Sequence, residues 1–159
     1  MRKHQKGFSL IELLIVVAII LIIAAIAIPN LLRSRMAANE ASAVGSLRTI
    51  NTAEVTYATT YPTIGFAALT ALGGTAPCTS ATSTSACLLD DVLSATAATK
   101  SGYLFTVTPG TQTPVVTYTS LATPVVVGQS GQRAFCSDQS GVIRNNATGT
   151  SCGASDSAL

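Results

Sequence analysis

The sequence is short of charge, histidine and tryptophan, and these shortages narrow the possible functions. Only 10% of its 159 residues are charged, whereas a soluble globular domain carries roughly 25%. This composition excludes a disordered acidic or basic chain and indicates a membrane segment or an unusually apolar assembly. The net charge of +2 is too weak and too evenly spread to indicate nucleic-acid binding.

One long apolar run stands near the amino terminus. Residues 13 to 28 read LLIVVAIILIIAAIAI, and the stretch from Phe8 to Ile28 has 21 residues. A helix of that length is about 31 Å long, which matches the roughly 30 Å hydrocarbon core of a bilayer. We expect a membrane-spanning helix rather than a buried core helix, because so small a chain has no second domain to cover it.

A basic segment precedes the apolar run, as in a secretory signal. It holds Arg2, Lys3 and Lys6, and cationic flanks stay in the cytoplasm. In a cleaved signal peptide the apolar stretch ends with a small-x-small cleavage site. This run instead continues into Pro29 and a helical pattern. The apolar segment is therefore expected to be retained.

Glu12 interrupts the apolar segment about one turn from its cytoplasmic end. A carboxylate at the centre of a bilayer costs about 2.5–3.5 kcal/mol, and less toward the interface. Two interpretations stand side by side. Glu12 is either a tolerated interfacial acid or a charge that meets its partner only in an assembled state.

These features together resemble the amino-terminal segment of type IV prepilins and the related pseudopilins. The similar stretch reads KGFSLIELLIVVAIILIIAAIAIPN. The resemblance implies that a membrane peptidase cuts between Gly7 and Phe8 and that the new amino terminus, at Phe8, is N-methylated. Glu12 stands at the acidic position of the family, fifth after the cut, and Pro29 matches a proline that many members carry.

Cleavage at Gly7 would remove three basic side chains and His4, leaving six basic against seven acidic residues and a net charge of −1 (6 − 7). The processed chain then has no imidazole for a Ser–His or Cys–His nucleophile, and we expect no enzymatic activity. The new amine of Phe8 can pair with Glu12 of a neighbouring subunit, because an isolated charge in an apolar bundle is costly. Such pairing would set the axial registry of subunits.

The resemblance implies a structural subunit, a pilin that polymerises through its apolar helix into a type IV pilus on the cell surface. Its expected partners are further copies of itself, the prepilin peptidase and methyltransferase, the pilus assembly platform and, before assembly, the inner membrane, with the amino terminus cytoplasmic. No cofactor and no small-molecule substrate are expected. One alternative is a pseudopilin of a type II secretion system, which forms a short periplasmic filament. Another is a monomeric membrane-anchored binding module, although a simple anchor gains nothing from Glu12.

The sequence predicts an α+β protein in three segments. Residues 1–7 form the leader, residues 8–61 form a long helix with 8–28 as transmembrane segment or filament core, and residues 62–159 form a disulfide-stapled head. After the apolar run the helix becomes amphipathic, and Asn51 is assigned to its polar side. The apolar face holds Met36, Ala43, Leu47, Ile50 and Tyr57.

Two prolines interrupt the helical pattern. Pro62 is expected to end the helix. Pro29 cannot donate a hydrogen bond to the carbonyl of Ala25, so it predicts either a kink tolerated in the membrane or a point where the helix melts and stretches during assembly.

Alternating apolar residues in the head predict three or four antiparallel strands laid on the helix. The expected strands cover residues 103–108, 115–119, 133–136 and 142–144. Residues 137–141 read as a tight hairpin connection, with Gly141 at a positive φ.

Four cysteines allow three disulfide pairings. We favour Cys78–Cys87 and Cys136–Cys152, because sequential pairs close short loops on neighbouring elements. The second pair would pin the tail, as a carboxy-terminal bridge does in many pilins. Zinc is the competing interpretation, but the sequence has no Cys-x-x-Cys and the processed chain no histidine, so no metal site is expected.

The remaining polar motifs are weak. Asp90 and Asp91 are a poor acid–base pair, because adjacent side chains point apart in an extended chain. They are read as the solvated start of a short helix, with calcium binding as the alternative. Asn146-Ala-Thr148 matches an N-glycosylation pattern, and the many serines and threonines make O-linked sugar equally plausible.

Overall fold

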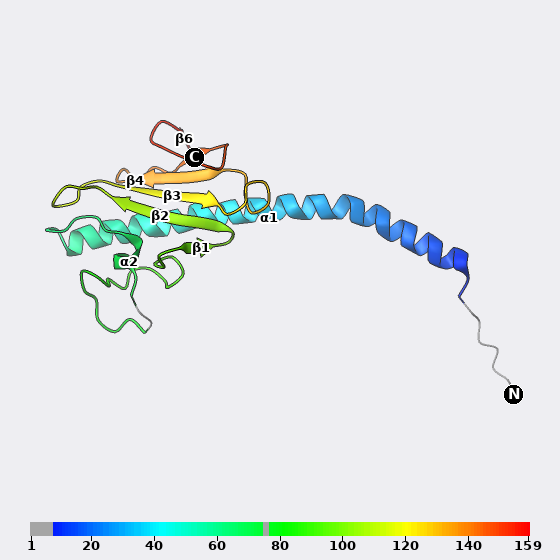
Figure 1. Ribbon diagram of the computed structural model, residues 1–159, viewed down its shortest axis with the longest axis horizontal. Coiled ribbons are helices and arrows are strands. Elements are labelled where there is room, and N and C mark those ends of the chain that lie inside the picture. The colour runs from blue at the N-terminus through cyan, green and yellow to red at the C-terminus, as the bar shows by residue number, and fades with distance from the viewer. Residues whose placement is uncertain (1–7, 75–76) are drawn as a thin grey trace. The chain divides into compact units, whose positions relative to one another are not determined.

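The computed structural model describes residues 8–74 and 77–159. By its internal contacts the chain forms two compact units, one ending at Arg35 and the other running from Met36 to Leu159. One helix, α1 (Leu10–Thr60), contributes to both units (Figure 1). The head unit therefore contains the last part of this helix as well as the residues after it.

Helix α1 begins and ends within two residues of the predicted bounds, and it continues without a break through Pro29. It ends just before Pro62, whose ring is incompatible with the helix interior. Tyr61 still donates its backbone N–H to the carbonyl of Tyr57.

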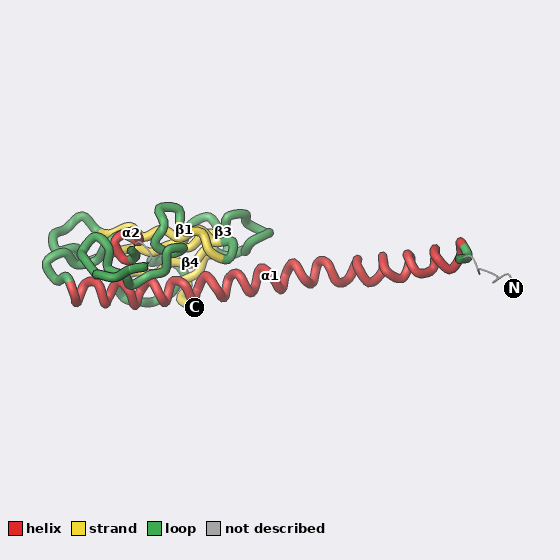
Figure 2. The backbone as a smooth tube through the Cα atoms, turned by 90° about the horizontal axis from the view of Figure 1, so that it is seen from below, coloured by secondary structure: helices red, strands yellow, loops and turns green. Residues whose placement is uncertain are grey.

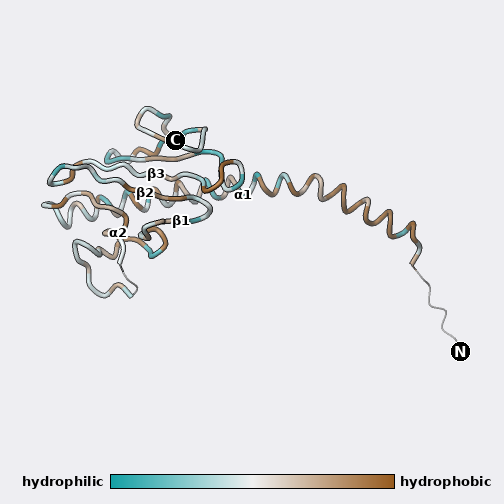
Figure 3. Tube along the Cα trace, viewed as in Figure 1, coloured by the Kyte–Doolittle hydropathy of each residue, from teal (hydrophilic) through white to brown (hydrophobic). Residues whose placement is uncertain are grey.

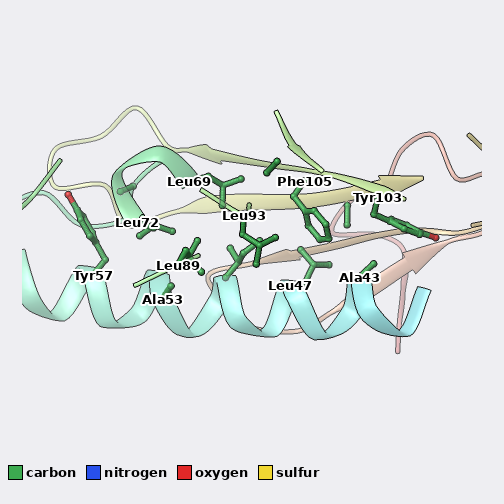
Figure 4. Close-up of a cluster of buried hydrophobic side chains, with 14 of the residues drawn as sticks. Ala43, Leu47, Ala53, Tyr57, Leu69, Leu72, Leu89, Leu93, Tyr103 and Phe105 are labelled. Atoms are coloured by element: carbon green, nitrogen blue, oxygen red, sulfur yellow. The ribbon is translucent and has the colours of Figure 1, made fainter. Parts of the chain in front are cut away.

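In the head, α1 and the sheet pack face to face (Figure 2). The buried face of α1 includes four of the five residues predicted for it, and Met36 is half-buried. Leu47 and Ile50 are fully buried beside Phe105 and Leu93 in one apolar core (Figure 4). The assignment of Asn51 to the polar side was wrong. Asn51 is buried, donates to the Ser137 hydroxyl at 2.8 Å and accepts from the Tyr118 hydroxyl at 3.0 Å.

The sheet has six antiparallel strands in sequence order, each paired with the next. A meander of this kind needs only short connections between neighbouring strands. The strands are β1 (Ala98–Lys100), β2 (Tyr103–Pro109), β3 (Tyr118–Pro124), β4 (Ala134–Asp138), β5 (Arg144–Asn146) and β6 (Ser157–Ala158).

The antiparallel α+β class is confirmed, but several strand predictions were wrong in number or position. The short β1 and β6 were missed. The second strand lies three residues later than predicted, because residues 118–124 pair with all of β2, whereas Val115 forms only an isolated bridge with Gly65. The fourth lies two residues later, at Arg144–Asn146. Gly141 has the predicted positive φ, 73°.

The connection between α1 and β1 contains one short helix, α2 (Leu69–Leu72). The helix predicted to start at Asp90 is absent from this described part of the chain, where residues 91–93 form a turn instead. Asp90 accepts the backbone N–H of Leu93 at 2.9 Å, so its carboxylate stabilises the turn as it would a helix start.

Both disulfides join the pairs favoured from the sequence. Cys78 and Cys87 have Cα atoms 5.8 Å apart, and Cys136 and Cys152 have Cα atoms 5.6 Å apart. The second bridge links β4 to the carboxy-terminal loop, which runs beside the sheet (Figure 1).

A conservative core truncation gives a first test of this packing. Ile50→Val should lower the free energy of unfolding by about 1 kcal/mol, because it removes one buried methylene. Denaturant unfolding of the full chain in detergent measures this change. Val55→Ala, on the exposed side of the same helix, is the control and should have a smaller effect. An equal loss in both variants would contradict the assigned faces.

Candidate assembly site

The amino-terminal unit exposes apolar side chains around its whole circumference. Phe8 and Leu10 are each 80% exposed, and the large apolar residues from Ile11 to Leu32 are 46–64% exposed. Figure 3 shows that this part of α1 is hydrophobic along most of its length. In the described part of the chain, α1 is the helix long and apolar enough to cross a membrane by length and composition. Apolar side chains exposed on this scale require lipid or other protein to cover them.

Glu12 has a local partner that the sequence analysis missed. One of its carboxylate oxygens accepts the backbone N–H of Ser9 at 2.9 Å. Ser9 precedes the first helical residue, so Ser9-x-x-Glu12 has the spacing of a capping box. Of the two hydrogen bonds in that motif, this is the one in which the glutamate carboxylate accepts the backbone N–H of the N-cap residue. The carboxylate that we expect to set subunit registry therefore caps α1 in the single chain.

The other site residues that the resemblance implies for the amino-terminal segment lie in or near it. Phe8 is exposed ahead of α1, and Pro29 lies inside the helix. Gly7 and the rest of the leader lie outside the described residues. Phe8 thus lies four residues before Glu12 at one end of an apolar helix.

Two buried carboxylates in the head were also missed, because both sit on the face assigned to apolar packing. Glu40 accepts the backbone N–H groups of Gln132 and Arg133 and a two-pronged contact from the Arg133 guanidinium, at 2.8 to 3.1 Å. Burial raises the pKa of Glu40, but these hydrogen bonds outweigh it and hold the pKa below its ordinary value. This cluster ties α1 to the start of β4.

Glu54 lies deeper and is fully buried. One carboxyl oxygen accepts the backbone N–H of Ala67 at 3.0 Å, and the other has no partner among the described residues. Burial raises the pKa of Glu54 to about 7, against a smaller lowering by the Ala67 hydrogen bond. Glu54 thus connects α1 to the segment before α2 through a carboxyl group that is half protonated near neutral pH.

No group of three or more metal-ligating side chains occurs in residues 8–74 and 77–159. The Asp90 carboxylate accepts the backbone N–H of Leu93 and forms an ion pair with Lys100 at 3.1 Å. The side chain of Asn146 is engaged as well, since it donates to Asp156 and accepts from Thr148. Neither predicted polar motif therefore presents a free ligand set here.

Comparison with known proteins locates the family signal at the amino terminus. Residues 2–28 match the family model of the prokaryotic N-terminal methylation motif. The chain is 63% identical over 38 residues to the type IV wide pilus major component PilA4 of Thermus thermophilus, covering 24% of this chain and 29% of that protein. It is 46% identical over 54 residues to the type IV major pilin protein PilA of Myxococcus xanthus, covering 34% and 24%.

These matches confirm the resemblance to type IV prepilins over the amino-terminal segment. The matched part spans less than a third of either relative. No solved structure matches the chain. The chain thus has an amino-terminal methylation motif on a long apolar helix, followed by an α+β head, and it is similar to type IV pilins over the matched segment.

Proposed function

We propose that this chain is the structural subunit of a type IV pilus and polymerises through its apolar helix. One observation carries the proposal: residues 8–32 expose large apolar side chains on every side. Such a surface is stable only in lipid or among other apolar helices. Other copies of the same helix would provide that cover in a filament, and the relatives that share this segment are pilins.

The same proposal orders the steps before assembly. The subunit first rests in the inner membrane with its amino terminus in the cytoplasm, since Arg2, Lys3 and Lys6 flank the helix there. A prepilin peptidase then cuts between Gly7 and Phe8, the Phe8 amine is methylated, and an assembly platform adds the subunit to a filament at the cell surface.

Within the filament, Glu12 of one subunit would pair with the Phe8 amine of the next. Each charge is costly in an apolar bundle unless the other is present. Pro29 would mark the place where α1 loosens as subunits pack, because its ring removes one helix hydrogen bond.

Filaments sheared from cells test this proposal directly. Mass spectrometry of the sheared material should find this chain as the bulk subunit, beginning at Phe8 with one methyl group on its amine. A subunit that begins at Met1 would contradict the processing step. Cells that keep the processed chain in the membrane and carry no filament of it would contradict the polymer.

A further inference from the structure

Residues 64–67 lie between α1 and α2 in the chain, and we call them the strap. One side of the strap is attached to the loop before β3. Phe66 donates its backbone N–H to the carbonyl of Val115 at 3.0 Å, and Val115 donates its own N–H to the carbonyl of Ile64 at 2.7 Å. Val115 forms only an isolated bridge, so the strap lies outside the ladder that pairs β3 with β2. Few backbone hydrogen bonds therefore need to break for the strap to lift away from the head.

The Glu54 side chain attaches the strap to α1. Its Oε2 atom accepts the backbone N–H of Ala67 at 3.0 Å, whereas its Oε1 atom has no partner among the described residues. The residue is fully buried, so no solvent reaches either oxygen while the strap is in place. Burying a polar group without a partner is costly, and burying a charged group is far more costly. The closed strap therefore suits the neutral form of this carboxyl group and not its carboxylate.

The side chains around Glu54 supply no positive charge to balance a carboxylate. Its titratable neighbours are Tyr57 of α1 and Tyr118 of β3, and burial raises the pKa of both, so both are neutral at pH 7. The strap and α2 contain no titratable side chain. No cation forms an ion pair with Glu54 in the described part of the chain. Water is then the group that remains to solvate an ionised Glu54.

We propose that the strap is a proton-controlled cover for Glu54, closed while the carboxyl group holds its proton and open once that proton has passed to solvent. In the open state the carboxylate gains hydrogen bonds from water, which offset those lost at Ala67 and Val115. Opening also separates Phe66 from Tyr118, whose ring centroids are 4.7 Å apart in the closed state. The open head therefore exposes an aromatic ring and unpaired backbone groups of the strap. The proposal is independent of filament formation.

Backbone hydrogen exchange of the full chain in detergent tests the cover. Rates are compared as protection factors, which remove the intrinsic pH dependence of amide exchange. The pKa of Glu54 is about 7 when buried, against an ordinary 4.5. Ala67 protection should therefore fall about tenfold from about pH 6 to about pH 8. The Gly128 amide, which donates to the Gly131 carbonyl at 2.8 Å in the β3–β4 loop, should keep constant protection. Constant protection of Ala67 would overturn the proposal.

Comparison with the sheet separates lifting of the strap from unfolding of the whole head. The amides that pair β2 with β3 exchange when the head unfolds, so their protection should exceed that of Ala67 at least roughly tenfold at each pH. Equal protection of Ala67 and these sheet amides would show that Glu54 is hydrated only by global unfolding. That result would refute a separate cover.

Variants assign the proton to Glu54. Glu54→Gln keeps an acceptor for the Ala67 N–H but cannot ionise, so Ala67 protection should be equal at both pH values. Glu54→Met removes the acceptor as well, so Ala67 should be about fivefold less protected at both pH values. Asp91→Asn removes an exposed carboxylate and is the matched control, which should keep the tenfold fall of the parent. In each variant the β2–β3 amides report whether the head is folded. A tenfold fall with pH in folded Gln or Met protein would assign the proton to another group and refute the proposal.

Discussion

Glu12→Gln is expected to leave the subunit in the membrane while filament yield falls at least roughly tenfold. The amide keeps an oxygen that can accept the Ser9 N–H, so the cap on α1 is preserved while the charge is lost. Membrane insertion should be equal or improved, because a charged group leaves an apolar segment. Assembly should fail because the Phe8 amine of the next subunit would be buried without a counter-charge, at a cost of about 3–5 kcal/mol.

Sheared filaments and membrane-bound subunit are to be measured in the same cultures. Glu12→Val removes the charge and the cap together, and Glu12→Asp retains the charge on a shorter side chain. If Glu12→Val makes no filaments while Glu12→Gln makes a normal amount, Glu12 acts only as a helix cap. Normal filaments from both would identify a tolerated interfacial acid. Loss of the subunit from membranes would move the defect to insertion or folding.

The head should lose stability as the pH rises through neutrality, and Glu54 should cause most of that loss. Its pKa is about 7 in the folded chain against an ordinary value of 4.5. Below pH 4.5 both folded and unfolded states are protonated. Between 4.5 and 7 only the folded state keeps the proton, so the free energy of unfolding falls as the pH rises, by about 3 kcal/mol in all.

Denaturant unfolding of the full chain in detergent, across the range from about pH 5 to 8, measures this slope. Glu54→Gln keeps an acceptor for the Ala67 N–H but cannot ionise, so its stability should be nearly constant across the range. Asp91→Asn removes an exposed carboxylate and should keep the slope of the parent. A parent protein with no slope, or a Gln variant with the full slope, would contradict the assignment.

Burial makes ionisation of Glu54 unfavourable, and the Ala67 hydrogen bond compensates only in part. Its titratable neighbours are Tyr57 of α1 and Tyr118 of β3. Burial raises the pKa of both tyrosines, and the charge of Glu54 raises each of them further. No cation forms an ion pair with Glu54 among the described residues, where the two ion pairs are Lys100–Asp90 and Arg133–Glu40.

Glu40 acts in the opposite direction on the same helix. Because its folded pKa lies below 4.5, the stability that it contributes is present above that value and is lost as the pH falls further. The two carboxyl groups therefore act in separate windows, Glu40 in acid and Glu54 between about pH 4.5 and 7.

The long amino-terminal helix could be predicted almost entirely from the sequence. An uninterrupted apolar run, a basic flank and an acid at a fixed offset are local features, so the long helix follows without tertiary information. The same features carry the resemblance to type IV prepilins. The two disulfide pairs were also accessible, because sequential cysteines close short loops. Capping of α1 by Glu12 was readable too, since Ser9 and Glu12 have capping-box spacing.

Only the tertiary structure decided which polar residues are buried in the head and where its strands begin. Glu40, Asn51 and Glu54 are buried because partners far along the chain, at Arg133, Ser137 and Ala67, meet them. Helical periodicity contains no information about such partners. The register of β3 follows from its pairing with β2 along residues 103–109, which outweighs the β-branched run at Val115 and Val116.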